Sequence, residues 1–213
     1  TEDQAGATAV VHAALDAGIT FFDTADIYGK EFGLSERLLG EALRGRRDEV
    51  VIATKFGHPS YPPPDADGTP MGSRAYIRRA VEGSLRRLGV ETIDLYQHHM
   101  PDPATPVEET LAALDELVQE GKIREIGSSN YSAAQVRDAD RLARESGGVR
   151  FVTAQNEYNL LARDAERELL PVAAELGIGF LPWYPLANGL LTGKFTRTER
   201  PADSRIARQR PQL

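Results

Sequence analysis

The chain has no cysteine among its 213 residues, which excludes disulfide bonds, thiolate nucleophiles and cysteine-ligated metal sites. It also has no apolar run approaching the roughly 20 residues that a membrane-spanning helix needs. The start, Thr1-Glu2-Asp3-Gln4, lacks the basic and then apolar pattern of a signal peptide. We therefore expect a cytoplasmic protein that does not bind membranes.

Positive charge is also in short supply. The formal net charge is -7, and an excess of negative charge disfavours nonspecific binding to nucleic acid. Hydrophobic residues make up 41% and charged residues 27%, which is ordinary for a globular protein with a sizeable core. The length allows one large domain, although a complete α/β barrel usually needs about 250 residues.

Polar residues end each of the strand-like runs of the chain. These runs cover residues 19–23, 49–55, 93–99, 123–128, 151–155 and 178–183. They end at Asp23, Lys55, His99, Ser129 with Asn130, Gln155, and Trp183 with Tyr184. Helix-like segments lie between them, so the pattern predicts a parallel βα array. In such arrays the carboxyl ends of the strands share one rim, where we expect these side chains to meet.

Capping residues place the helices between these strands. We expect a first helix over residues 4–17 and further helices that open at Ser35 and Ser73. Thr105 and Ser132 each resemble the start of a capping box. A sixth helix should start at Asp164, and Pro171 inside its pattern should kink it or shift its start.

The two adjacent histidines should have different roles because neighbouring strand residues face opposite sides of a sheet. His99 shares a face with Leu95 and Gln97, whereas His98 shares one with Tyr96. We interpret His98 as a structural residue between strand and helices, so that leucine should be tolerated there. His99 is the candidate for the rim.

Asp23, Tyr28, Lys55 and His99 form the candidate catalytic group. A buried lysine needs a counterion, and Asp23 could supply it in a purely structural ion pair. Tyr28 lies five residues after Asp23 and could lean over the strand ends. A nearby ammonium favours the phenolate form and lowers the pKa of a tyrosine, which would suit it to donate a proton near neutral pH.

Two further segments have an unusual composition. Residues 57–72 (GHPSYPPPDADGTPMG) are rich in proline and glycine, and a loop of this length is usually functional or disordered. A mobile surface loop and a substrate-gating loop are equally compatible with it. Residues 194–213 are basic and could form a solvated tail or a flap over an anionic cofactor.

Six strings, in this order, resemble the aldo-keto reductase superfamily, and most closely its bacterial, channel-β-subunit-like branch. They are FFDTADIYG followed by SE, VVIATKFG, IDLYQHHMPDP, REIGSSNYS, AQNEYNLL and WYPLANGLLTGKF, and the resemblance covers residues from about 8 to 194. It implies a (β/α)8 TIM barrel that transfers hydride from a nicotinamide cofactor, usually NADPH, to the carbonyl group of a small aldehyde or ketone. No metal is implied.

The resemblance also implies a role for each candidate residue. Tyr28 would be the general acid, Lys55 would lower its pKa, Asp23 would pair with Lys55, and His99 would orient the carbonyl. Ser129, Asn130 and Gln155 would bind the nicotinamide carboxamide. Trp183 stands where the family usually has a tyrosine, and Tyr184 stands where it often has a serine. The segment from Leu186 to Leu190, with Asn188 and Gly189, would line the pyrophosphate through its backbone.

Only about six βα units, the second to the seventh strands of such a barrel, are expected in residues 1–213, which would form a single partial domain. The first strand should precede residue 1, and the last strand with the 2′-phosphate segment should follow residue 213. We therefore expect either a part of a longer protein, which we favour, or a naturally truncated chain. Two other functions remain open. One is a noncatalytic, cofactor-sensing regulatory subunit, and the other is a Schiff-base aldolase that uses Lys55. The oligomeric state and the physiological carbonyl are not indicated.

Overall fold

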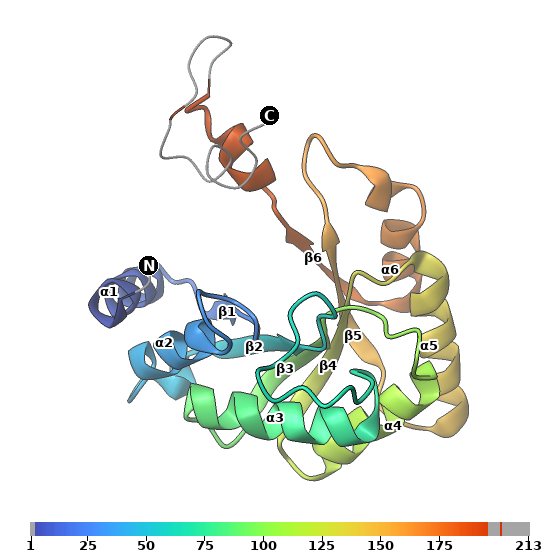
Figure 1. Ribbon diagram of the computed structural model, residues 1–213. Coiled ribbons are helices and arrows are strands. Elements are labelled where there is room, and N and C mark those ends of the chain that lie inside the picture. The colour runs from blue at the N-terminus through green and yellow to red at the C-terminus, as the bar shows by residue number, and fades with distance from the viewer. Residues whose placement is uncertain (1–2, 196–200, 202–213) are drawn as a thin grey trace.

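The computed structural model describes residues 3–195 and residue 201, and it contains one sheet of six strands in sequence order, β1-β2-β3-β4-β5-β6. All neighbouring strands are parallel. The strands are β1 (Phe21–Asp23), β2 (Val51–Phe56), β3 (Ile93–His98), β4 (Ile123–Ser129), β5 (Phe151–Glu157) and β6 (Gly179–Trp183). Figure 1 shows the sheet curling into a half-barrel flanked by helices. The partial (β/α)8 barrel expected from the sequence is confirmed.

Six α-helices connect and flank these strands. They are α1 (Gln4–Asp16), α2 (Leu34–Ala42), α3 (Arg74–Leu88), α4 (Val107–Gln119), α5 (Ala133–Ser146) and α6 (Leu169–Leu176), with short 3-10 turns η1 (Arg47–Glu49), η2 (Asp164–Glu166) and η3 (Ala187–Thr192). Among the described residues, no helix is both long and apolar enough to cross a bilayer.

Two of the expected helix starts are confirmed in atomic detail. The Ser73 side chain accepts a hydrogen bond from the backbone N–H of Tyr76 at the start of α3. Ser132 and Gln135 form a complete capping box at the start of α5. Such caps satisfy backbone donors that a helix end leaves open.

Two other starts differ from the expectation. Helix α2 begins at Leu34, directly after Gly33, which has a left-handed backbone. The Ser35 hydroxyl does not cap this helix and accepts a hydrogen bond from Thr24 Oγ1 at 2.8 Å. Helix α4 follows Pro106 without a side-chain cap. The hydroxyl of Thr105 donates instead to Asp102 Oδ2 at 2.9 Å, so the expected capping box at Thr105 is wrong.

Pro171 shifts the start of α6, which is one of the two outcomes expected from the sequence. Asp164 begins only a 3-10 turn, and α6 starts at Leu169, which leaves Pro171 within its first turn. Proline is tolerated there because the first helical N–H groups have no intrahelical acceptor.

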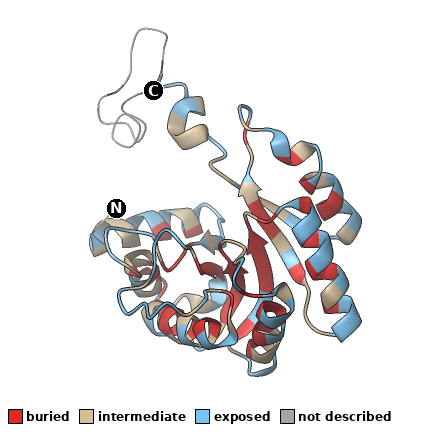
Figure 2. Ribbon diagram, turned by 45° about the vertical axis from the view of Figure 1, so that its right-hand side comes forward, coloured by how far each residue is buried: buried red, intermediate tan, exposed pale blue. Residues whose placement is uncertain are grey.

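The core lies between the sheet and its helices (Figure 2). Strand β3 is buried along its whole length, and β2 is buried except at Val51. Burial on both faces is typical of central strands in parallel sheets. The outer strands are less covered, so that the side chain of Phe21 in β1 remains 39% exposed.

The faces of the two histidines are confirmed. The His98 ring is 1% exposed and stacks on Phe56 with centroids 4.9 Å apart. Its Nδ1 lies 2.8 Å from the hydroxyl of Tyr131, itself buried. The expectation that leucine is tolerated at position 98 overlooked this bond, which joins residues 33 positions apart.

We now expect His98→Leu to destabilise the fold by about 1–3 kcal/mol, because the buried Tyr131 hydroxyl would lose its partner. Urea unfolding of the single and double variants measures this. In the double variant His98→Leu with Tyr131→Phe no hydroxyl is orphaned, and part of the lost stability should return. Equal stability of His98→Leu and the unaltered protein would contradict the role of the hydrogen bond.

Candidate functional site

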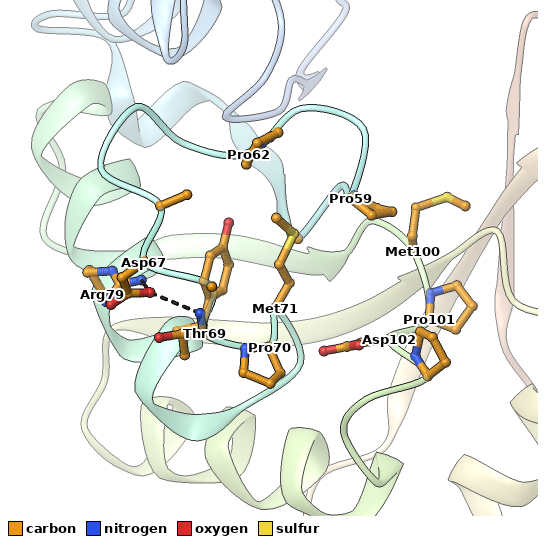
Figure 3. A pocket seen from close by; sticks show the side chains of 15 residues that line it. Pro59, Pro62, Asp67, Thr69, Pro70, Met71, Arg79, Met100, Pro101 and Asp102 are labelled. Carbon is orange, nitrogen blue, oxygen red and sulfur yellow. Dashed lines mark hydrogen bonds and ion pairs between the residues drawn. The ribbon is translucent and has the colours of Figure 1, made fainter.

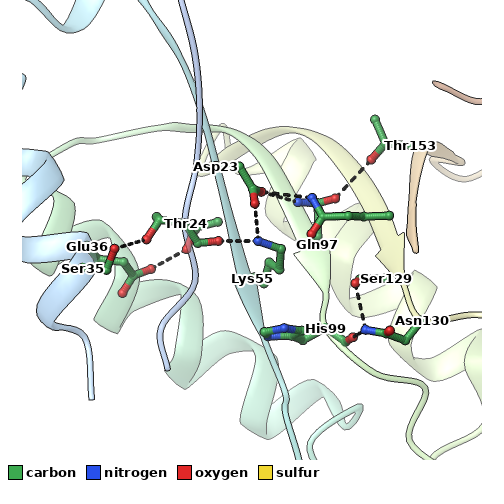
Figure 4. Close-up of polar contacts among 12 residues, drawn as sticks. Asp23, Thr24, Ser35, Glu36, Lys55, Gln97, His99, Ser129, Asn130 and Thr153 are labelled. Carbon is green, nitrogen blue, oxygen red and sulfur yellow. Dashed lines mark hydrogen bonds and ion pairs between the residues drawn. The ribbon is translucent and has the colours of Figure 1, made fainter. Parts of the chain in front are cut away.

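The buried ammonium of Lys55 lies at the centre of the site. Its Nζ donates to Asp23 Oδ2 at 2.6 Å and to the carbonyl of Thr24 at 2.7 Å (Figure 4). The side chain of Lys55 is 0% exposed, and burial lowers its pKa while the Asp23 carboxylate opposes that change. Nζ also lies 4.9 Å from the ring centroid of Tyr28. The predicted convergence of Asp23, Lys55 and Tyr28 is therefore present.

The second oxygen of Asp23 is held by two amides. Gln97 Nε2 donates to Asp23 Oδ1 at 3.1 Å, and Gln155 Nε2 does so at 3.3 Å. Gln97 is 0% exposed and accepts a hydrogen bond from Thr153 Oγ1. We did not single out Gln97 in the sequence, although its place on the same strand face as His99 was the signal that could have identified it.

His99 presents a neutral ring beside Tyr28. The two ring centroids are 5.9 Å apart at an interplanar angle of 84°, and His99 is 6% exposed. Burial, followed by the positive charge of Lys55, lowers the pKa of His99 to about 3. A neutral imidazole carries one N–H that can donate a hydrogen bond. His99 can thus bind a carbonyl oxygen without bringing a second cation.

The end of β4 is tied to the end of β3. Asn130 has a left-handed backbone, with φ of 61°. Its Nδ2 donates to the backbone carbonyl of His99 at 2.9 Å and to Ser129 Oγ at 3.0 Å. The N–H of Asn130 donates to the carbonyl of Gln155 at 3.0 Å. Ser129, Asn130 and Gln155 thus form one hydrogen-bonded group next to His99.

Trp183 and Tyr184 lie at the end of β6, beside β5. Their rings meet edge to face, with centroids 4.8 Å apart. Trp183 Nε1 is buried and has no hydrogen-bond partner among the described residues. Four non-glycine residues of the described chain have positive φ, and three of them, Tyr184, Ala187 and Asn188, fall in this segment. Such outliers cluster at functional sites.

The expected pyrophosphate segment is not brought to the catalytic group. Leu186 and Leu190 are 52% and 42% exposed, and Asn188 and Gly189 lie in the same turn, η3. Figures 1 and 2 both show η3 extending away from the sheet. The basic segment 194–213 lies mostly outside the described residues. The roles of both segments remain predictions.

The proline-rich loop lines a cavity of about 270 Å³, together with the start of α3 and the segment that follows β3. The labelled residues in Figure 3 include Arg79 at one end of the cavity and Met100 and Pro101 at the other, with Pro59 next to Met100 and Met71 between the two ends. Tyr28, Lys55 and His99 do not line this cavity. The cavity therefore lies outside the catalytic group.

The aldo/keto reductase family model matches residues 2–212. This chain belongs to the aldo/keto reductase family.

Individual relatives agree with this assignment. The chain is 44% identical to the uncharacterized oxidoreductase YrpG of Bacillus subtilis, with 99% of this chain and 68% of that protein covered. It is 42% identical to a probable aldo-keto reductase 1 of Glycine max, with 92% and 54% covered. It is 38% identical to a probable voltage-gated potassium channel subunit beta of Oryza sativa, with 94% and 61% covered.

The chain spans between about half and two thirds of the length of these three family members, from 54% to 68%. The described part supplies the strand ends that hold the candidate catalytic group. What the whole protein reduces and binds is therefore a matter of proposal.

A second buried group of charges lies behind the catalytic rim. Glu36 accepts hydrogen bonds from Thr54 Oγ1 and from Arg87 Nε, both at 2.6 Å. Asp26 is 1% exposed and its Oδ1 has no partner among the described residues. Burial, reinforced by the Glu36 carboxylate, raises the pKa of Asp26 to about 8. Asp26 is thus expected to hold a proton at neutral pH.

This shift predicts that the free energy of unfolding falls as pH rises toward 8. Between about pH 4 and pH 8 the folded protein keeps a proton on Asp26 that the unfolded chain releases, so stability falls as pH rises through this window. Asp26→Asn should remove this part of the slope and gain stability relative to the unaltered protein as pH rises from 6 to 9.

Melting temperatures across this pH range measure the effect, and substitution of the exposed Asp65 by asparagine is the matched control. Melting curves of Asp26→Asn that change with pH in parallel with those of the unaltered protein would contradict the raised pKa.

Proposed function

We propose that the whole protein reduces an aldehyde or ketone to an alcohol with NADPH, and that Tyr28 donates the proton. Family membership and the oxidoreductase name of one relative support carbonyl oxidoreduction as the general class. The observation that carries the finer proposal is the fully buried Lys55 ammonium, which is fixed by Asp23 and lies 4.9 Å from the Tyr28 ring.

Each group has a distinct part in this proposal. The Lys55 charge stabilises the phenolate that Tyr28 leaves behind when its O–H bond breaks and the proton passes to the carbonyl oxygen. The N–H of neutral His99 binds the same oxygen and fixes its position. Asp23 keeps Lys55 oriented, while Gln97 and Gln155 keep Asp23 oriented.

The residues at the ends of β4, β5 and β6 fit a nicotinamide. Ser129, Asn130 and Gln155 offer neutral hydroxyl and amide groups, the partners that a carboxamide needs. Trp183 adds an aromatic surface and a buried N–H that has no acceptor in the described part of the chain. When bound, the reduced cofactor supplies the hydride that adds to the carbonyl carbon.

The preference for NADPH over NADH rests on the family resemblance alone.

The side chain of Gln155 already donates to Asp23, so its amide would serve the cofactor and the catalytic group together.

The alternatives differ in their support. The name of the rice relative, a probable channel subunit beta, keeps a noncatalytic regulatory role open as a second candidate. The complete set of Asp23, Tyr28, Lys55 and His99 favours catalysis over that role. A Schiff-base aldolase is disfavoured because Lys55 Nζ is enclosed and held by two oxygen acceptors.

Tyr28→Phe tests the proton donor in the full-length protein. Turnover of an aldehyde should fall by at least the roughly 10²–10⁴-fold typical of a general acid, while the affinity for NADPH stays nearly unchanged. Nicotinamide absorbance gives the turnover and nicotinamide fluorescence gives the affinity. Tyr158→Phe, which removes a hydroxyl that donates to Glu166 and to none of the four candidate catalytic residues, is the matched control. Retention of more than half of the turnover in Tyr28→Phe would exclude the assignment.

Lys55→Met tests the coupling between the ammonium and the phenol. Without the positive charge Tyr28 should hold its proton to higher pH, so the alkaline fall of the residual kcat should move upward. A kcat profile against pH measures this shift. An unchanged profile would show that Lys55 does not act on the proton donor.

A further inference from the structure

Four rings form a continuous series from the catalytic group to the solvent. The Tyr28 ring meets His99 at 5.9 Å, His99 meets His58 at 4.8 Å, and His58 meets Tyr61 at 5.2 Å between centroids. The three contacts are edge-on or tilted, with interplanar angles of 84°, 87° and 59°. Such geometries are the favourable ones for aromatic pairs. His58 and Tyr61 belong to the proline-rich loop and have no part in the proton transfer.

The start of the loop fixes His58 over His99. Gly57 directly follows β2 and has φ of 79°, a left-handed conformation that favours glycine. A Cβ at Gly57 would lie 3.1 Å from the ring of His98, so the chain passes close to the sheet before it turns. Pro59 then restricts the backbone after His58. The backbone on both sides of His58 is therefore restricted, and its imidazole contacts the rings of His99 and Tyr61.

The remainder of the loop is anchored as well. Gly72 N–H donates to Asp102 Oδ2 at 2.7 Å, and Thr110 Oγ1 donates to the carbonyl of Gly72 at 2.8 Å. Asp67 pairs with Arg79 of α3, as Figure 3 shows. Tyr61 is followed by three prolines, which stiffen the chain that carries it. The loop that carries His58 and Tyr61 is thus anchored to the rest of the fold.

The exposed surface of this series is aromatic and uncharged. Burial lowers the pKa of His58 below its usual value, and its Nδ1 accepts a hydrogen bond from the N–H of Ser60 at 3.3 Å. This arrangement leaves the ring neutral at pH 7, with its proton on Nε2. Tyr61 is 59% exposed. A carbonyl bound between Tyr28 and His99 would have His58 as the nearer of these two rings and Tyr61 beyond it.

We propose that His58 and Tyr61 form the wall that contacts the substituent of the carbonyl substrate, and that this wall selects planar aryl aldehydes over saturated ones of equal size. This inference rests on the proposed function for the position of the carbonyl. It assigns specificity to two residues outside the catalytic group.

The first experiment compares benzaldehyde with cyclohexanecarboxaldehyde in the full-length protein. The two aldehydes carry six-membered rings of similar size, one flat and one puckered. The ratio of their kcat/KM values in each variant is divided by the ratio in the unaltered protein, which cancels their intrinsic reactivities. The preference for benzaldehyde should fall about 3- to 10-fold in His58→Leu, as expected from the worth of one aromatic pair. Tyr61→Leu should lower it by a smaller factor.

The aromatic variants are the matched controls. His58→Phe and Tyr61→Phe keep a ring at each position and should keep the preference to within about twofold, because ring contact supplies the selectivity. An unchanged ratio in His58→Leu would overturn the proposal, since His58 would then act on both aldehydes alike through His99 or not at all. Equal losses in His58→Leu and His58→Phe would overturn it too.

A binding measurement separates this inference from the proposed function. Benzamide and cyclohexanecarboxamide are unreactive carbonyl compounds whose affinities can be measured by calorimetry without turnover. Tighter binding of benzamide that weakens in His58→Leu and not in His58→Phe would support the wall even in a protein that oxidises no NADPH. Equal affinities of the two amides for the unaltered protein would overturn the proposal that His58 and Tyr61 select aryl groups. Reduction of an aldehyde would still support the proposed function in that case.

Discussion

The burial of one ammonium group constrains the whole rim of this barrel. Lys55 Nζ is withdrawn from water, and an unpaired charge in such a place would cost several kcal/mol. Asp23 and the carbonyl of Thr24 compensate the charge. The negative charge of Asp23 is compensated in turn by amides from two other strands, Gln97 of β3 and Gln155 of β5. Two of the described strands, β1 and β2, therefore supply the ion pair and two more, β3 and β5, supply side chains that solvate it, which links the ends of these four strands.

The adjacent residues His98 and His99 lie in two different environments at this rim. His98 points into the apolar layer and bonds to Tyr131, while His99 points to the polar interior and faces Tyr28. Alternation along a strand produces this separation without any special device. Both imidazoles remain neutral, because burial lowers the pKa of His98 to about 4 and that of His99 to about 3.

Local patterns in the sequence were sufficient for the order of the six strands, the polar residue at each strand end, the opposite faces of the histidines and the capping boxes at Ser132. They were insufficient where a side chain has several partners within reach. Thr105 and Ser35 have the residue types of helix caps, yet each hydroxyl bonds elsewhere, to Asp102 and Thr24. Gln97 contacts Asp23 across 74 residues, and a pairing over that distance depends on how the sheet curls to bring β1 and β3 together, which no local pattern encodes.

The charges of Lys55 and Asp23 lie beside the rings of His99 and Tyr28. The positive charge of Lys55 helps to keep His99 neutral, and the same charge would favour release of a proton by Tyr28. Full neutralisation of Lys55 by Asp23 would weaken both effects. The two amide hydrogen bonds occupy Asp23 Oδ1 and stabilise the carboxylate, so that Oδ2 is the oxygen that contacts Lys55. Gln97 and Gln155 therefore determine how the carboxylate is oriented toward the ammonium beside the two rings.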